Sequence, residues 1–103
     1  MNNRAKILDI AMNLNRLGNW AADDYNAKKG RISTFLTNTS SYLQNLDTTS
    51  LPKIFMGTFN TFLKEYRLLE KEAAKELKNP IFWAEDMITW GNILTHRSKL
   101  IQD

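Results

Sequence analysis

Apolar side chains recur every three or four residues along most of the chain. The clearest series lies between the two prolines, with steps of 4, 3, 4, 3, 4 and 4: Phe55, Phe59, Phe62, Tyr66, Leu69, Ala73 and Leu77. Such spacing places these side chains on one face of a helix, because a strand repeats every two residues. Proline suits the first turn of a helix and ends the helix that precedes it. The pattern therefore predicts helices over residues 51–78 and about 80–101, with Phe59, Phe62, Tyr66 and Leu69 in the core.

The N-terminal half keeps one helical phase across Gly18 and Gly30. A single rod of about 44 residues would be about 66 Å long at 1.5 Å per residue, which exceeds the width of a domain this size. Each glycine also costs a helix interior about 1 kcal/mol relative to alanine. We therefore predict separate helices over residues 3–28 and 31–46, and one long kinked helix is the alternative.

The composition fits one ordinary globular domain over residues 1–103. Hydrophobic residues make up 43% of the 103 positions and charged residues 24%, with only 4 glycines and 2 prolines. That balance excludes disordered and low-complexity chains, and the scarcity of turn residues disfavours strands. The chain has no cysteine, no apolar run of membrane-spanning length and no signal-peptide pattern. We expect an all-α bundle of three or four helices in the cytoplasm, with no membrane association.

The residues that usually carry catalysis or hold a metal are sparse. His96 is the single histidine, and neither a phosphate-binding glycine loop nor a serine nucleophile motif occurs. Two acidic pairs, Asp23 with Asp24 and Glu85 with Asp86, are adjacent in sequence, so the carboxylates of each pair point about 100° apart on a helix. We therefore predict that the protein is not an enzyme and takes no metal and no cofactor.

Basic side chains form two groups that suit phosphates or an acidic partner. The first, here called the basic ridge, follows one face of the predicted helix 51–78 within an arc of about 80°. Its members are Lys64, Arg67, Lys71, Lys75 and Lys78. The second group surrounds Gly30, close to Tyr25, and consists of Lys28, Lys29 and Arg31. Glutamates flank the ridge and the net charge is only +3, so a solvated helix face is the commoner explanation for the ridge.

Large apolar side chains cluster at the start of the last predicted helix. The run Ile81, Phe82, Trp83 and Ala84 is wider than one buried stripe needs, and Trp90 lies two turns from Trp83 on the same face. Core filling is the usual role of such residues, but tryptophan is also enriched at binding hot spots. Ile81, Phe82, Trp83 and Trp90 are therefore our candidate partner-binding residues.

These features favour a small helical protein that acts through protein contacts, as an adaptor, a regulator or a subunit of an assembly. A homodimer is the simplest arrangement that would cover the apolar run and the longer form of the N-terminal helix. The alternative is a nucleic-acid-associated helical subunit that contacts phosphates through the basic ridge. Both expectations depend on which of these side chains the fold leaves exposed.

Overall fold

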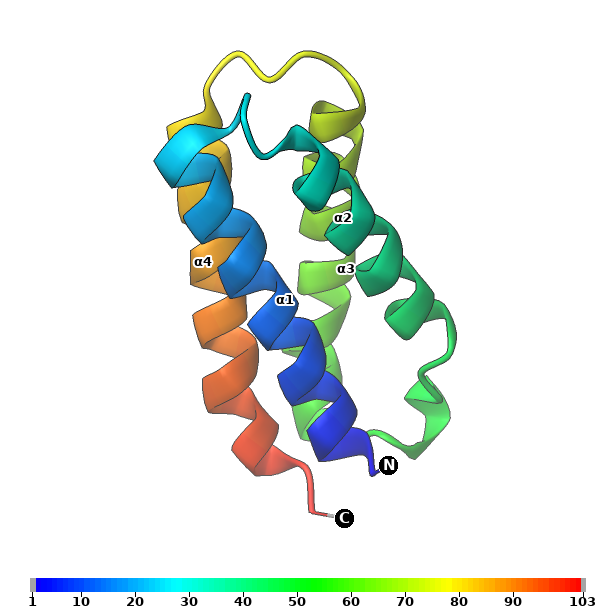
Figure 1. Ribbon diagram of the computed structural model, residues 1–103. Coiled ribbons are helices and arrows are strands. Elements are labelled where there is room, and N and C mark those ends of the chain that lie inside the picture. The colour runs from blue at the N-terminus through cyan, green and yellow to red at the C-terminus, as the bar shows by residue number, and fades with distance from the viewer. Residues whose placement is uncertain (1, 103) are drawn as a thin grey trace.

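The computed structural model describes residues 2–102 and consists of helices joined by short turns (Figure 1). Its four α-helices are α1 (Asn3–Asp24), α2 (Lys29–Gln44), α3 (Lys53–Ala74) and α4 (Pro80–Arg97). Two single-turn 3-10 helices, η1 (Thr48–Ser50) and η2 (Ser98–Leu100), precede α3 and follow α4. No strand occurs among the described residues. The prediction of an all-α bundle is therefore confirmed, with four helices.

Consecutive helices run in opposite directions, so both chain ends lie at the same end of the bundle (Figure 1). The bundle measures 39 × 20 × 19 Å along its principal axes, which is the shape expected of aligned helices of 16 to 22 residues. Within residues 2–102, no helix combines the length and the apolar character needed to cross a membrane.

Asparagine side chains cap the N-terminal ends of two of the helices. The Asn2 side-chain oxygen accepts a hydrogen bond from the backbone N–H of Ala5 at 2.8 Å, at the start of α1. The Asn79 side-chain oxygen accepts one from the N–H of Phe82 at 3.1 Å, and Pro80 follows at the first helical position of α4. Both caps satisfy N–H groups that lack a partner inside the helix, so the local sequence specifies where these helices start.

The N-terminal half is broken into two helices, and the long kinked helix is not adopted. The break covers residues 25–28, where the Asp24 carboxylate accepts a hydrogen bond from the N–H of Ala27 at 3.1 Å. α1 therefore ends four residues before the predicted position 28, and α2 begins at Lys29 and ends at Gln44 instead of covering 31–46. Gly18 lies inside α1 without interrupting it, and Gly30 lies in the first turn of α2.

Two glycines let α1 and α4 approach each other closely. A Cβ atom on Gly18 would lie 2.4 Å from Ile88 Cγ1 and 2.8 Å from the Ala84 carbonyl oxygen of α4. A Cβ atom on Gly91 of α4 would lie 2.7 Å from Asn15 Oδ1 of α1. Non-bonded carbon contacts are optimal at about 3.5 to 4.0 Å, so a Cβ atom at Gly18 would collide with the α4 backbone, and one at Gly91 would require the Asn15 side chain to shift.

The core contains a row of aromatic rings on the inner face of α3. Ring centroids of successive residues Phe55, Phe59, Phe62 and Tyr66 are 5.5, 5.9 and 5.6 Å apart. Each of these side chains is at most 2% exposed, and Leu69 on the same face is 4% exposed. The predicted placement of Phe59, Phe62, Tyr66 and Leu69 in the core is confirmed, because the helical period aligns them on one face.

The second half of the chain departs from the prediction at three helix ends. α3 begins at Lys53 and ends at Ala74 instead of covering 51–78, because Lys75 has extended backbone (φ −101°, ψ −177°). The chain then crosses from α3 to α4 over residues 75–79, and Leu77 packs against the core from this loop. α4 ends at Arg97, where the predicted helix to 101 tightens into η2.

Candidate functional site

The four candidate partner-binding residues do not share one environment. Ile81 is 49% exposed and Phe82 is 64% exposed in the first turn of α4. Trp83 is 1% exposed, and its indole Nε1 donates a hydrogen bond to the Leu69 carbonyl oxygen at 2.9 Å. Trp90 is partly buried, with its ring centroid 5.7 Å from that of Phe62. The interpretation of Trp83 as a surface anchor is therefore wrong, and the α4 patch consists of Ile81 and Phe82.

A hollow of about 440 Å³ lies beside Phe82, between the end of α3, the 75–79 loop and α4. Its lining comprises Glu72, Lys75, Glu76, Leu77, Lys78, Asn79, Phe82, Trp83 and Asp86. Leu77 and Phe82 supply apolar surface over the buried Trp83, and charged side chains of both signs surround them. An apolar centre with a polar rim is the usual anatomy of a protein interface. Sequence reasoning missed this hollow because the helical pattern continues through residues 75–78.

The basic ridge is interrupted. Lys64, Arg67 and Lys71 lie on α3, but Lys75 and Lys78 lie beyond the end of the helix and line the hollow beside Phe82. The predicted five-residue ridge is therefore wrong in its second half, because it required helix through residue 78. Glu65 and Glu72 are exposed on α3, so the remaining ridge has a mixed charge.

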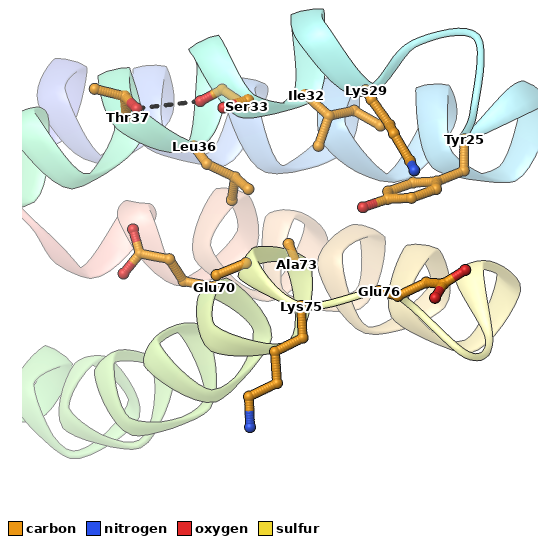
Figure 2. A pocket seen from close by; sticks show the side chains of 11 residues that line it. Tyr25, Lys29, Ile32, Ser33, Leu36, Thr37, Glu70, Ala73, Lys75 and Glu76 are labelled. Atoms are coloured by element: carbon orange, nitrogen blue, oxygen red, sulfur yellow. Dashed lines mark hydrogen bonds between the residues drawn. The ribbon is translucent and has the colours of Figure 1, made fainter.

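A larger cleft of about 620 Å³ separates α2 from the end of α3. Ile32, Leu36 and Ala73 line its apolar part (Figure 2). At one end the Lys29 ammonium lies 5.7 Å from the centre of the Tyr25 ring, and burial raises the pKa of that tyrosine. Figure 2 shows the Lys75 side chain directed away from the cleft. Within residues 2–102, no three His, Asp or Glu side chains are placed to hold a metal ion.

Polar contacts join α2 to α3 next to this cleft. The Tyr66 hydroxyl donates a hydrogen bond to the Leu36 carbonyl oxygen at 3.1 Å, and it lies 3.4 Å from the Ser40 hydroxyl. Ser40 in turn donates to the Glu70 carboxylate. Burial raises the pKa of Tyr66 to about 12, because the tyrosinate form would lose its hydration. These contacts hold α2 against α3, and we call them the polar seam.

Each of the three side chains in the second basic group contacts a different partner. Lys28 forms an ion pair and hydrogen bond with Asp23, which lowers the pKa of that carboxyl group. Lys29 lies over the Tyr25 ring, as described above. The Arg31 guanidinium carbon lies 5.2 Å from the centre of the Trp20 ring. The three cations therefore do not form one phosphate site around Gly30.

Arg31 belongs to a surface that the sequence analysis missed. The Trp20 and Phe35 rings meet edge to face, with centroids 4.8 Å apart and planes at 89°. The Arg16 guanidinium carbon lies 5.8 Å from the centre of the Phe35 ring. We call Arg16, Trp20, Arg31 and Phe35 the arginine–aromatic stripe. In the sequence, an arginine precedes an aromatic residue by four positions twice, as Arg16 and Trp20 in α1 and as Arg31 and Phe35 in α2. This spacing, which places each pair on one helix face, could have indicated the stripe.

Comparison with known proteins identifies no relative of this chain. No protein-family model matches the chain, and no curated protein or solved structure is significantly similar to it. The candidate surfaces are therefore chosen by geometry, exposure and charge. The α4 patch with its hollow is the main apolar candidate, and the arginine–aromatic stripe is the main cationic one.

Proposed function

We propose that this protein is a non-enzymatic helical module that binds another protein through the α4 patch, as an adaptor, a regulator or a subunit of an assembly. The observation that carries the proposal is the exposure of Phe82, which lines a hollow with a charged rim, next in sequence to the exposed Ile81. Buried aromatic anchors surrounded by polar residues dominate the binding energy of many protein interfaces.

The local structure gives no reason for phenylalanine at position 82. Phe82 is the third residue of α4, where the helix dipole favours an acidic side chain. Burial of a phenylalanine side chain stabilises a protein by about 1.5 to 3 kcal/mol, and a ring that is 64% exposed gains only a fraction of this. A partner that covers the ring would recover the rest, so the exposed ring is better explained by binding than by folding.

Phe82→Asp tests this proposal, with Ile54→Asp as its matched control. Ile54 is 68% exposed, and it lies in the first turn of α3 at the opposite end of the bundle (Figure 1). Both changes place an acidic residue where a helix dipole favours it, so both variants keep the fold. Proteins that cross-link to the wild type in its host are identified, purified and titrated against all three forms by calorimetry.

The expected result is a loss of affinity of at least about tenfold for Phe82→Asp, which is typical of a removed hot-spot residue. Ile54→Asp retains wild-type affinity. Equal losses in both variants, or an unchanged affinity in Phe82→Asp, would contradict the proposal. Circular dichroism of each variant confirms that the helices remain formed.

A further inference from the structure

We propose that the arginine–aromatic stripe binds a single strand of nucleic acid. The stripe lies on α1 and α2, and it contains none of the residues assigned to protein binding. Two rings in contact lie between two cations: Arg31 lies over Trp20, Trp20 contacts Phe35, and Phe35 lies beneath Arg16. The inference is therefore independent of the proposal for the α4 patch.

The geometry leaves the binding groups of both arginines accessible. Arg16 and Arg31 are exposed, and Trp20 and Phe35 are partly buried beneath them. A guanidinium that stacks on a ring uses one planar face for the contact. Both guanidinium groups are exposed and lie within cation–π distance of a ring, so their outward N–H donors are available to a phosphate and their planar groups are available to a base.

The charge around the stripe favours an anionic ligand. No acidic residue occurs between Ile10 and Ala22 or between Tyr25 and Leu46 in the sequence. Of the two carboxylates between those stretches, Asp23 pairs with Lys28 and Asp24 accepts a hydrogen bond from the N–H of Ala27. On α3, by contrast, exposed glutamates alternate with the lysines. The stripe is therefore a better phosphate-binding surface than the basic ridge.

The face continues along α2 with groups that suit a flexible strand. Arg31, Phe35, Asn38 and Tyr42 follow one another at steps of 4, 3 and 4, so they share one side of the helix over about 16 Å. Asn38 is exposed, and Tyr42 is 48% exposed and shares a small hollow with Lys6 and Asp9, whose charges are opposite. An amide and a phenol hydroxyl supply hydrogen bonds to sugar and base, and the phenol ring offers a further stacking surface.

A single strand fits these groups better than the other anionic partners do. An acidic peptide would use only the N–H edges of the arginines, whereas the bases of a single strand also use their planar faces. A duplex keeps its bases stacked inside, and binding driven by its charge requires a larger excess than the net charge of +3. Planar side chains combined with a modest positive charge therefore select an unpaired strand.

The test measures the fluorescence anisotropy of labelled oligouridine and oligothymidine of about 12 nucleotides. The wild type is expected to bind, and the slope of log affinity against log salt is about −1.4 if two phosphates are neutralised. Arg16→Glu with Arg31→Glu is expected to weaken binding by more than about tenfold. The matched double variant Lys64→Glu with Lys71→Glu, which makes the same charge change on α3, is expected to lose less than about threefold.

Three outcomes overturn the proposal: no binding by the wild type at about 50 mM salt, equal losses in the two double variants, or tighter binding of polyglutamate or of a duplex of equal length. Equal losses would mean that net charge alone attracts the strand.

A conservative variant isolates the stacking contribution. Arg16→Lys with Arg31→Lys keeps both charges and removes both planar groups. We expect it to lose affinity by at least about fivefold, since base stacking contributes about 1 to 3 kcal/mol per base. Wild-type affinity in this variant would overturn the stacked arrangement. Thermal melting followed by circular dichroism shows that each variant is folded at the assay temperature.

Discussion

Two of the four glycines lie where α1 contacts α4, whereas a Cβ atom on either of the other two would meet no facing atom within 4 Å. Packing therefore favours glycine at both positions, and most strongly at Gly18, where a Cβ atom would lie 2.8 Å from a backbone oxygen of α4. Gly57 lies exposed inside α3, where glycine only adds backbone freedom to the unfolded chain. The same residue type thus has opposite effects at the two kinds of position.

Alanine substitutions distinguish these two roles. Gly18→Ala is expected to lower the free energy of unfolding by about 1 to 3 kcal/mol, because the added methyl group overpacks the α1–α4 contact. Gly57→Ala is expected to raise it by about 0.4 to 1 kcal/mol, because alanine is the better helix former and nothing obstructs it. Urea denaturation followed by circular dichroism measures both. A stabilising Gly18→Ala would show that the two helices can separate without cost.

The sequence alone could not distinguish these two roles of glycine. The sequence presents Gly18 only as a poor helix former, and the facing atoms of Ile88 and Ala84 that require it become visible only in three dimensions. Phe82 and Trp83 illustrate the same limit. The apolar run at the start of α4 predicts that part of it is exposed, but it does not identify which ring turns inward to reach the Leu69 carbonyl oxygen.

The polar seam joins α2 to α3, in addition to the core contacts of Ile32 and Leu36. Tyr66 is 2% exposed, and its neutral hydroxyl donates a hydrogen bond to the Leu36 carbonyl oxygen next to the α2–α3 cleft. The tyrosinate form cannot donate this hydrogen bond, and burial of its charge is unfavourable. One of the contacts that hold α2 against α3 therefore depends on the protonation of Tyr66.

This dependence predicts a loss of stability in alkali. The pKa of Tyr66 is raised from 10 in the unfolded chain to about 12 in the fold. Its contribution is therefore fully present below pH 10 and is lost as the pH rises through 12, by about 2 to 3 kcal/mol at 1.36 kcal/mol per pH unit. Urea denaturation between neutral pH and pH 12 measures this loss. Tyr66→Phe, which cannot ionise, should be less stable than the wild type at neutral pH but should lose less stability in alkali.

The helices themselves were largely predictable, whereas the ends of α1 and α3 were not. The helical period along α3 predicts its buried face from Phe55 to Leu69, and each of those side chains is in the core. The same period continues to Leu77, although this residue is apolar for another reason, since it packs on the core from the loop. The spacing of apolar residues in a sequence indicates which side chains contact the core. A loop residue that packs on the core therefore cannot be distinguished from a helical one by this spacing.

For the whole molecule, the division of the N-terminal half removes one of the two reasons to expect a homodimer. A long kinked helix would have left apolar surface uncovered, but α1 and α2 fold back and both contribute side chains to the core. The α4 patch remains as the second reason. A stable interface buries about 800 Å² on each partner, roughly one eighth of the 6353 Å² surface of this chain. Two side chains in one helical turn provide only the centre of such an area.

We therefore expect a monomer of 12.0 kDa at micromolar concentration, and a different protein as the occupant of the α4 patch. Sedimentation velocity across a concentration series measures this directly. If the wild type forms a dimer and Phe82→Asp restores the monomer while Ile54→Asp does not, the occupant is a second copy of the chain. A dimer that persists in Phe82→Asp would place self-association on another surface. In either case the arginine–aromatic stripe would retain its affinity for a single strand, because its four residues belong to α1 and α2 and not to the patch.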